Sequence, residues 1–444
     1  MRAANLRQPM KVDPDRLASR LEAELGRAAV RRQPELLAAR AVDGLYPCLI
    51  CSPANAEEVS AALQVCSETD AAVTPWGGGT AVQIGNLPER VEIIIDVSKL
   101  NHLVEHDDAN LTAIVQSGIT LAASQEITAG ARQFVPFDVP NPQRSTIGGI
   151  VAGNLNGARR VCYGSVRDLV IGMKVALPTG EHIKAGGKVV KNVAGYDMCK
   201  LFVGSLGTLG IITEVTLRLT PLPQAEATLA ASGDLLQLSE FAGEILDSVL
   251  LPSATVLWKS ETSSSSEAPQ SGWQMAVRAE GFAEQVSRHL RDLQLMAERL
   301  SLRTAVCSTA AHEKLWAGIC DFPLLGHEVV FRVTVPRSAI ADLLRCVQDW
   351  DSTDFSPAIV ADMAAGAIWI GSNEIRSAAA RFAQLRSKAA RHKGHVVLLD
   401  APADLKRDLD IWGLAPEAFF LMRRIKQQFD PQRLMNPGRF VGRL

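Results

Sequence analysis

The stretch from Ser145 to Pro223 constrains what this chain can fold into more than any other. It holds four glycine-rich segments: S-T-I-G-G-I-V-A-G-N-L-N-G, Y-G-S-V-R-D-L-V-I-G, G-G-K-V-V-K-N-V-A-G-Y-D and G-S-L-G-T-L-G-I-I-T-E. Glycine disfavours long helices and strands, but its backbone adopts positive φ and approaches a ligand closely. Short strands are predicted over Val170–Leu177, around Ile183 and over Ile211–Leu219. The pattern indicates a ligand lying along glycine-rich strand ends; the alternative is a compact β region with glycines at turns and bulges.

A second glycine cluster, Pro75-Trp76-Gly77-Gly78-Gly79-Thr80, follows a predicted strand over Ala71–Thr74. Consecutive peptide N–H groups in a glycine turn converge into an anion-binding nest, and Thr80 adds a hydroxyl donor. This arrangement suits a pyrophosphate. The cluster is neither a Walker loop, which needs a following Lys-Ser/Thr, nor a G-x-G-x-x-G turn that opens a helix.

Taken together, these clusters resemble the vanillyl-alcohol-oxidase (PCMH-type) family of FAD-linked oxidases, in which a triple-glycine loop binds the FAD pyrophosphate and a T-I-G-G segment follows. Within the family, the chain is most similar to the FAD-binding subunit of bacterial glycolate oxidase that accompanies the catalytic flavoprotein. The matching runs are Gly148–Ala152, Gly164–Asp168, Lys191–Asp197 and Asn436–Arg439. The resemblance covers about Cys48–Pro223 and the last two dozen residues well, and the middle weakly.

The resemblance implies an α+β fold with a two-subdomain FAD-binding PCMH-type domain, a ferredoxin-like α/β cap domain and a C-terminal segment that returns to the flavin domain. We expect a helical extension over residues 1–40, the FAD-binding domain over 41–223, a cap for substrate or partner over 224–410, and the return segment over 411–444. Pro221-Leu222-Pro223 marks the end of the flavin domain. The serine-rich run 261–272 is predicted to be a surface loop.

Periodicity and end signals predict the remaining elements. Helices are predicted over Arg16–Gly26, Pro34–Ala41, Asn55–Ser67, Thr120–Ala129, Gln285–Ser301, Arg337–Asp349, Glu374–Lys393 and Ala415–Gln428. Strands are predicted over Cys48–Cys51, Val91–Val97, Leu111–Gln116, Ala254–Lys259, Gln274–Ala279 and Val329–Val335. The proline-rich segment Phe134–Pro142 is expected to be an extended connection. In the final helix we interpret Arg423, Arg424 and Lys426 as a solvated or partner-facing surface.

Bulk composition narrows the class of protein. The 444 residues suffice for two or three domains, and 47% hydrophobic with 21% charged residues is typical of a globular protein. A net charge of −2 gives no reason to expect nucleic acid as a partner. No apolar run is long enough to span a bilayer, and Met1–Arg20 lacks the apolar core of a secretory signal. Eight scattered cysteines suit a reducing compartment. We expect a cytoplasmic protein, held at the inner face of the membrane if a complex places it there.

The resemblance implies FAD as the cofactor and assigns its contacts residue by residue. Gly77–Thr80 would bind the pyrophosphate through backbone N–H groups. Ser145, Thr146, Gly148, Gly149 and Gly153 would lie along the pyrophosphate, ribitol and ring. Asn154 and Asn156 would add polar contacts nearby, and Gly210 and Ile211 would hold the adenosine end. For each of them alone, the alternative is a turn glycine or a helix cap.

Three departures from the family pattern are informative. Members with covalent flavin often carry a histidine beside the glycine loop, where this chain has Thr80, so we expect non-covalent FAD. Cys162 lies where some bicovalent relatives have a linking cysteine, and we interpret it as a plain buried thiol. Leu206 replaces a glutamate that many hydroxyacid dehydrogenases carry in G-S-E-G-T-L-G, which removes one polar contact.

The catalytic residues are the least defined part of the sequence. Related hydroxyacid dehydrogenases carry an H-x-G-D-G-N-x-H motif that binds a metal or takes the substrate proton, and this chain lacks it. The histidines after the flavin domain are His289, His312, His327, His392 and His395. We interpret His392 and His395 as a helix-end pair rather than metal ligands, and expect no metal site. Asn436 and Arg439 are weak catalytic candidates that would touch the flavin or a carboxylate, or simply fix a turn.

The cysteine spacings indicate packing rather than redox chemistry. Cys48 and Cys51 fall in an apolar strand and have no second pair, so we interpret them as core residues rather than a redox or zinc site. The chain lacks Cys-x-x-Cys-x-x-Cys, so no iron–sulfur cluster is expected on it. Electrons leaving the flavin would therefore need a partner.

Three functions follow. The first is an FAD-binding subunit of a glycolate oxidase-like complex, which oxidises a small 2-hydroxy acid by hydride transfer to flavin, with a companion flavoprotein and an iron–sulfur protein as partners. The second is a self-sufficient FAD-dependent D-2-hydroxyacid dehydrogenase with an unfamiliar cap site. The third is a non-catalytic scaffold with a flavin fold.

Overall fold

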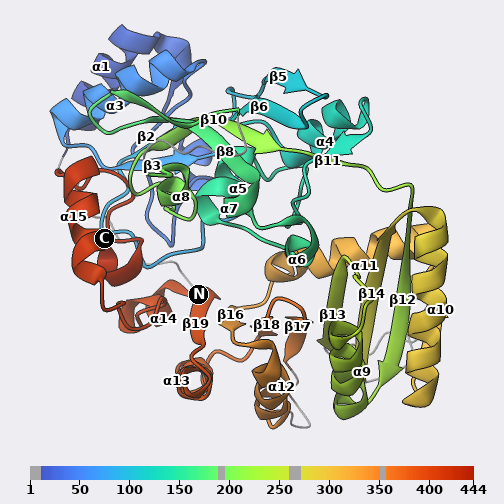
Figure 1. Cartoon of the computed structure of the whole chain (residues 1–444). Helices are drawn as coiled ribbons and strands as arrows, with labels where there is room; N and C mark the ends of the chain where they lie inside the picture. The colour runs from blue at the N-terminus through green and yellow to red at the C-terminus, as the bar shows by residue number, and fades with distance from the viewer. Residues whose placement is uncertain (1–11, 189–195, 260–271, 351–356) are drawn as a thin grey trace.

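The computed structural model describes residues 12–188, 196–259, 272–350 and 357–444 (Figure 1). Most of the run Lys191–Asp197 and nearly all of the predicted serine-rich loop lie outside these residues. The chain forms a flavin-type domain of two subdomains, followed by a separate cap built on one large sheet (Figure 1). The C-terminal segment returns from the cap to the first domain.

The first subdomain is a four-stranded sheet in the order β1-β2-β4-β3, in which β2, β4 and β3 are parallel. Helix α1 begins after Asp13, whose carboxylate accepts the Asp15 N–H (3.0 Å), and buries Leu17 and Leu21 in one core with Leu63 of α3. The N-terminal helix is thus part of this core. The elements are α1 (Pro14–Leu25), β1 (Val30–Arg31), α2 (Pro34–Ala38), β2 (Leu49–Cys51), α3 (Ala56–Thr69), β3 (Val73–Trp76) and β4 (Ile93–Asp96).

The second subdomain is an antiparallel sheet in the order β5-β6-β10-β8-β9, with short helices on one side. Its alternating apolar residues, including Val115, Val175 and Val215, are buried under helices α5 and α8. The elements are β5 (Leu103–Asp107), β6 (Thr112–Gln116), α4 (Leu121–Ala129), β7 (Gln133–Phe134), α5 (Ile147–Gly153), α6 (Arg160–Tyr163), α7 (Val166–Leu169), β8 (Val170–Ala176), β9 (His182–Gly186), α8 (Cys199–Phe202), β10 (Ile211–Arg218) and β11 (Thr220–Pro221).

The T-I-G-G segment is a helix, so our interpretation of glycine-rich strand ends is wrong at this point. Thr146 caps α5, its hydroxyl accepting the Gly149 N–H (3.3 Å), and Asn154 ends it in the left-handed region (φ 47°). A Cβ atom on Gly148 would lie 2.7 Å from the Ser117 Cβ atom. Glycine is needed there because the helix packs directly against the end of β6.

The cap is a single eight-stranded antiparallel sheet made of two ferredoxin-like halves. Each half runs β-α-β-β-α-β, and the strand order in each is fourth-first-third-second, joined through β13 and β17. The predicted ferredoxin-like cap is therefore present twice. The first half is β12 (Ala225–Gly233), α9 (Leu235–Asp247), β13 (Ala254–Lys259), β14 (Trp273–Gly281), α10 (Ala283–Arg299) and β15 (Arg303–Val306). The second is β16 (Val329–Thr334), α12 (Ile340–Gln348), β17 (Ala358–Asp362), β18 (Ala367–Ser372), α13 (Ala378–Arg391) and β19 (His395–Asp400).

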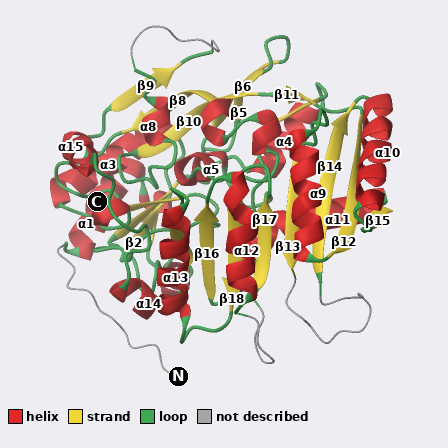
Figure 2. Cartoon of the chain, turned by 60° about the horizontal axis from the view of Figure 1, so that its bottom comes forward, coloured by secondary structure: helices red, strands yellow, loops and turns green. Residues whose placement is uncertain are grey.

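The two faces of the cap sheet have different partners (Figure 2). Helices α9, α10, α12 and α13 cover one face, and residues such as Phe241, Phe331 and Phe382 form a shared core there. The other face meets helix α11 (Thr309–Asp321), which connects the halves, and loops of the flavin domain. This second face supplies the site described below.

The C-terminal segment contains α14 (Ala403–Asp408) and α15 (Phe419–Phe429) and ends on the first subdomain. Lys426 of α15 is buried, which contradicts our interpretation of it as a surface residue. Its Nζ donates to the carbonyl oxygens of Thr208 (2.7 Å) and Met435 (3.0 Å) and to the Asp430 carboxylate (2.7 Å). The lysine thus fastens the return segment to the flavin domain.

The predicted elements are present with ends shifted by a few residues. The elements that were not predicted are β1, β5, β7, α5–α8, β11, β12, α9, β15, α11, β17–β19 and α14. Within the described ranges, no helix is long and apolar enough to cross a bilayer.

Candidate functional site in the flavin domain and beneath the cap

A narrow cleft runs between the triple-glycine loop and helix α5. Its volume is about 130 Å³. The loop after β3 forms one wall, α5 and the end of β6 form another, and residues 205–212 before and within β10 close it. The predicted residues that line it are Gly77, Gly78, Gly79, Thr80, Thr146, Gly148, Gly149, Gly153, Gly210 and Ile211.

The glycine loop can lie against its neighbours only because it lacks side chains. A Cβ atom on Gly78 would lie 1.7 Å from the Arg144 carbonyl oxygen, and one on Gly77 would lie 2.3 Å from the Thr146 Oγ1 atom. Gly79 adopts φ +70°. The Arg144 guanidinium also donates to the Gly78 carbonyl (3.0 Å). The loop and the start of α5 are therefore locked together at van der Waals contact.

Two buried polar atoms in this cleft lack hydrogen-bond partners. They are the Ser117 Oγ and the Asn436 Oδ1. A buried polar atom without a partner costs on the order of 1–3 kcal/mol, so the cleft fits a ligand that carries its own donors and acceptors. A dinucleotide with ribose, ribitol and phosphate groups meets this requirement. Ser117, which directly follows β6, was not predicted, since a single serine after a strand carries no signal of its own.

Three predicted residues lie beside the cleft rather than in its lining. Ser145 is buried, and its hydroxyl contacts the Thr80 hydroxyl (2.8 Å) and donates to the Pro140 carbonyl (2.6 Å). Asn154 and Asn156 line the next cavity, and Asn156 accepts the Val166 N–H through its Oδ1 (2.8 Å). These contacts shape the turns on either side of α5.

The two weak catalytic candidates line the cleft, with side chains largely held by the protein. The Asn436 Nδ2 donates to the Leu206 carbonyl (2.7 Å). The Arg439 guanidinium is paired with Asp43 (3.0 Å) and donates to the carbonyls of Val82 and Ile84. These contacts favour the turn-fixing alternative for Arg439. Asp43 also receives the buried Lys406 ammonium (2.7 Å), which donates to the Gln83 carbonyl as well (2.7 Å), so the C-terminal segment holds the chain that follows the glycine loop.

The cleft opens into a larger cavity between the flavin domain and the cap. Its volume is about 530 Å³, within the range of about 300–1,000 Å³ usual for small-molecule sites. Both cavities are lined by Thr80, Ala81, Gly153 and Leu206. The cap side is formed by β13, β16, β17, β18 and β19 together with the end of α11.

Arg332 of β16 faces this larger cavity. Its guanidinium lies 5.7 Å from the ring centre of Trp369, and its Nε has no hydrogen-bond partner. No carboxylate pairs with it among the described residues. Burial, followed by the nearby charge of Arg160, lowers the pKa of Arg332 to about 10, so it remains a cation at neutral pH. A cation placed in a cavity without a counter-ion favours an anionic ligand.

Two proton-carrying groups line the same cavity as Arg332. His395 on β19 pairs with Thr334, two residues along β16 from Arg332, and both line the cavity. Burial and the charge of Arg332 lower the pKa of His395, so its ring is neutral at pH 7. Asp362 at the end of β17 is buried, and burial raises its pKa to about 6. One oxygen accepts the N–H groups of Ala364 and Ala365, while the other has no partner.

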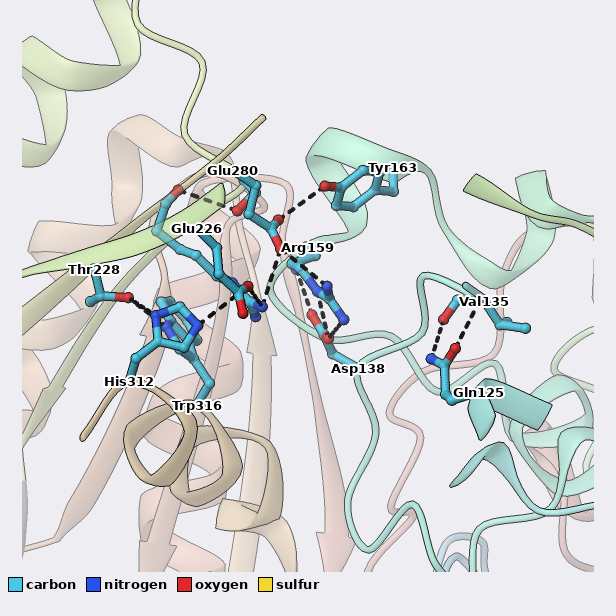
Figure 3. A network of polar contacts seen from close by, with 12 residues as sticks. Gln125, Val135, Asp138, Arg159, Tyr163, Glu226, Thr228, Glu280, His312 and Trp316 are labelled. Carbon is cyan, nitrogen blue, oxygen red and sulfur yellow. Dashed lines mark hydrogen bonds and ion pairs between the residues drawn. The ribbon is translucent and has the colours of Figure 1, made fainter. Parts of the chain in front are cut away.

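Ion pairs join the two domains beside this cavity (Figure 3). Arg159 of the flavin domain binds Asp138 (2.6 Å) and reaches Glu280 of the cap (3.3 Å). The Tyr163 hydroxyl also donates to Glu280 (3.1 Å), and Arg278 pairs with Glu280 on the cap side (3.1 Å). Although burial opposes it, the Arg159 charge lowers the pKa of Asp138. The cap is thus held in place by buried charges.

Two of the histidines outside the cavity have structural partners. His312 contacts the Thr228 hydroxyl (2.9 Å), and His392 contacts the Asp342 carboxylate (3.1 Å) at the end of α13. The predicted helix-end role therefore holds for His392, whereas His395 starts a strand and faces the cavity. Across the described part of the chain, no cluster of His, Cys, Asp and Glu could hold a metal ion.

The cysteines are free in the described structure. Cys48 is half-buried and Cys51 is buried, in agreement with core packing. Cys162 is exposed, so its interpretation as a buried thiol is wrong; it lies in the short surface helix α6.

Comparison with known proteins agrees with this geometry. A model described as an FAD-binding domain matches residues 47–186, and one described as the C-terminal domain of FAD-linked oxidases matches residues 413–440. These are the two segments that build the glycine cleft and its C-terminal support. The chain is an FAD-dependent oxidoreductase. FAD is the cofactor, and we propose that the residues lining the cleft hold it.

Similar FAD-linked oxidases include hydroxyacid enzymes. Glycolate oxidase subunit GlcD of Bacillus subtilis (strain 168) is 28% identical over 426 residues, which cover 89% of each chain. A mitochondrial D-lactate dehydrogenase (cytochrome) of Arabidopsis thaliana is 29% identical, covering 89% of this chain and 73% of that protein. A D-lactate dehydrogenase of Archaeoglobus fulgidus is 36% identical over 44% of this chain and 43% of its own length.

Solved structures share the fold at low sequence identity. Alkyldihydroxyacetonephosphate synthase superposes with a TM-score of 0.75 at 16% identity, covering 98% of this chain and 87% of that one. p-Cresol methylhydroxylase with substrate bound gives 0.73 at 16% identity, covering 96% of each chain. This FAD-dependent oxidoreductase therefore has the PCMH-type fold over nearly its whole length.

Proposed function

We propose that this oxidoreductase oxidises a 2-hydroxy acid to the 2-oxo acid in the cavity between the glycine cleft and the cap. The observation that carries the proposal is Arg332, a cation that faces the cavity without an acidic partner among the described residues. A guanidinium binds a carboxylate through two parallel hydrogen bonds. The similarity to glycolate oxidase and D-lactate dehydrogenases supports a 2-hydroxy acid as its source.

The chain's own groups have clear tasks in this reaction. FAD, when bound, supplies the acceptor for the hydride that leaves the α-carbon. Arg332 binds and orients the carboxylate, and stacking on Trp369 fixes the plane of its guanidinium. The neutral His395 ring accepts the proton of the α-hydroxyl as the carbonyl forms. The apolar cap residues around them exclude water.

We further propose that the chain works as part of a complex, with a companion flavoprotein and an iron–sulfur protein as electron acceptor. The similarity to a glycolate oxidase subunit supports this. The absence of the H-x-G-D-G-N-x-H motif distinguishes the chain from the companion flavoprotein that carries it and favours the accompanying FAD-binding subunit, in which the cavity beneath the cap would be an oxidation site of its own. FAD would be held without a covalent bond, since Thr80 stands at the position of the linking histidine. Acid should then release intact FAD from the protein.

The test is the visible spectrum of the purified chain under anaerobic titration with 2-hydroxy acids. Bleaching of the flavin absorption is expected, and Arg332→Met should lower kcat/KM about 100-fold or more, mostly through KM. Arg288→Met, at an exposed helix position, is the matched control. If every 2-hydroxy acid leaves the oxidised spectrum unchanged even with the partner proteins present, the proposed reaction is wrong. Bleaching only in their presence would assign the chemistry to the companion.

A further inference from the structure

We propose that the acid oxidised here carries a long apolar side chain with a hydrogen-bond donor at its far end, and that Asp362 binds this donor. The inference rests on the proposed function for the position of the carboxylate at Arg332. It narrows the substrate class to 2-hydroxy acids much larger than glycolate or lactate, such as those with a phenol ring.

The register of the cap sheet sets the spacing between the two polar ends. Arg332 pairs with Trp369 across β16 and β18, and Trp369 pairs with Val360 across β18 and β17. Asp362 lies two residues beyond Val360, on the same face. Neighbouring strands are about 4.8 Å apart and each residue advances about 3.3 Å along a strand, so the backbones of Arg332 and Asp362 are separated by roughly 12 Å along a diagonal of the sheet. Glycolate is too short to reach both.

The surface between these ends is apolar. Trp369 lies between Arg332 and Val360 in the register, Val360 is two residues from Asp362 on the same face of β17, and Val256 of β13, which pairs with Asp362, continues the apolar surface. Ile319 and Phe322, at the end of α11, line the cavity and pack in the same cluster as Val256 and Val360. Apolar walls contribute about 25 cal/mol per Å² when a ligand removes them from water. A two-carbon acid would leave most of this surface uncovered.

Asp362 supplies the independent observation for the far end. It is 1% exposed, it lines the cavity, and one carboxylate oxygen has no hydrogen-bond partner. The other oxygen holds the turn between β17 and β18, so the turn does not account for the free oxygen. A buried carboxylate oxygen is destabilising until a donor reaches it. A hydroxyl or phenol at the end of the substrate would be that donor.

The first experiment uses carboxylates that lack the 2-hydroxyl and therefore bind without reacting. Calorimetric titration of the FAD-loaded protein with propionate, 3-phenylpropionate and 3-(4-hydroxyphenyl)propionate should give increasing affinity in that order. The para-hydroxyl is expected to add about tenfold, since it would bond to a charged acceptor. Equal affinity for the last two ligands in the wild-type protein would overturn the role of Asp362 without needing any variant.

The second experiment removes the acceptor and keeps the shape. Asp362→Asn presents an N–H₂ group to the donor, so the tenfold preference for the para-hydroxyl should vanish while 3-phenylpropionate binding changes little. Asp404→Asn, at an exposed position, is the control. Retention of the preference in Asp362→Asn would contradict the assignment.

Flavin reduction separates this inference from the proposed function. Faster reduction by 4-hydroxyphenyllactate than by glycolate supports both. If the three inert carboxylates bind with the expected order of affinity but no 2-hydroxy acid reduces the flavin, the proposed reaction is wrong and the inferred specificity of the cavity is retained. If glycolate reduces the flavin but the three inert carboxylates bind with equal affinity, the inferred specificity is wrong and the proposed reaction is retained.

Discussion

Gly78 shows what a single position contributes to this site. A side chain there would meet the Arg144 carbonyl oxygen at 1.7 Å, and that backbone atom cannot turn away as a flexible side chain could. The contact joins the glycine loop to the segment before α5, and the cleft between them is the proposed place of the FAD pyrophosphate. Loop conformation and cofactor binding therefore depend on the same residue.

We expect Gly78→Ala to open the loop and lower FAD affinity at least about 100-fold, because backbone must move to admit the methyl group. The ratio of flavin to protein absorbance after purification measures this loss. Gly243→Ala, in helix α9 where no atom lies within 4 Å, is the control and should instead stabilise the chain by up to about 1 kcal/mol. Full flavin content in Gly78→Ala would contradict the role of the loop.

His395 predicts a pH dependence with a definite sign. Its pKa is lowered by burial and by Arg332, so the ring is neutral and able to accept a proton down to a pH below its ordinary value of about 6.5. The rate of flavin reduction should be constant near pH 7 and fall as the ring becomes protonated at lower pH. His395→Gln should lower the rate about 100-fold or more.

Two groups in the cavity could produce an acidic limb, a fall in rate at low pH, because burial raises the pKa of Asp362 to about 6. Comparing variants identifies which group is responsible. The limb should persist in Asp362→Asn and disappear in His395→Gln. Loss of the limb in Asp362→Asn alone would show that the carboxyl, rather than the imidazole, is the group that titrates.

Among the elements, helix α15 has a larger role than its sequence suggests. The buried Lys426 ammonium binds two carbonyl oxygens and Asp430, and Asp430 in turn accepts the N–H groups of Leu434 and Met435. The Lys426–Asp430 pair holds the turn that brings Asn436 into the cleft. Helix α15, although far from the glycine loop in the sequence, therefore positions part of the cleft lining.

Lys426→Met should destabilise the chain by about 3–5 kcal/mol, because it leaves Asp430 as a buried charge without its partner. Urea unfolding followed by fluorescence measures the change. Lys174→Met removes an exposed ion pair with Glu214 and should cost less than about 1 kcal/mol. Equal stability of the two variants would show that the Lys426 contacts contribute nothing.

Sequence alone predicts elements best where the period is strong or glycine has no substitute. The Gly77–Thr80 loop and strand β10 were predicted from local patterns and are present. Helix α5 was missed because its glycines serve close packing on β6, a tertiary contact that local propensity does not encode. Arg332, the one charge in the apolar run of β16, could have been noticed, whereas Asp362 depends on sheet register over distant strands.

For the whole molecule, the cap's position depends on charges buried between domains. Glu280 receives Arg159 and Tyr163 from the flavin domain and Arg278 from its own sheet. These contacts hold the cap over the cavity, and no disulfide joins the two domains among the described residues. The distance from Arg332 to the flavin domain is therefore set by this network.

Glu280→Gln keeps the shape and removes the charge, and we expect it to lower kcat/KM about tenfold or more while FAD content stays unchanged. Stopped-flow flavin reduction and the absorbance ratio report the two quantities separately. Glu244→Gln, which loses an exposed pair with Arg299, should behave like the wild type. If Glu280→Gln loses bound FAD to the same extent as kcat/KM, the ion pairs stabilise the flavin domain rather than the position of the cap.

The cap's two ferredoxin-like halves share one topology but contact different parts of the molecule. The inner face of the first half, with Glu226, Arg278 and Glu280, is occupied by α11 and the flavin domain. The same face of the second half, with Arg332, Asp362 and His395, is left open to the cavity. The first half therefore attaches the cap to the flavin domain, and the second half binds the ligand. Substitutions in the second half can change which ligand binds without weakening the contacts between the first half and the flavin domain, so new specificities can arise on this fold while the two domains stay packed together.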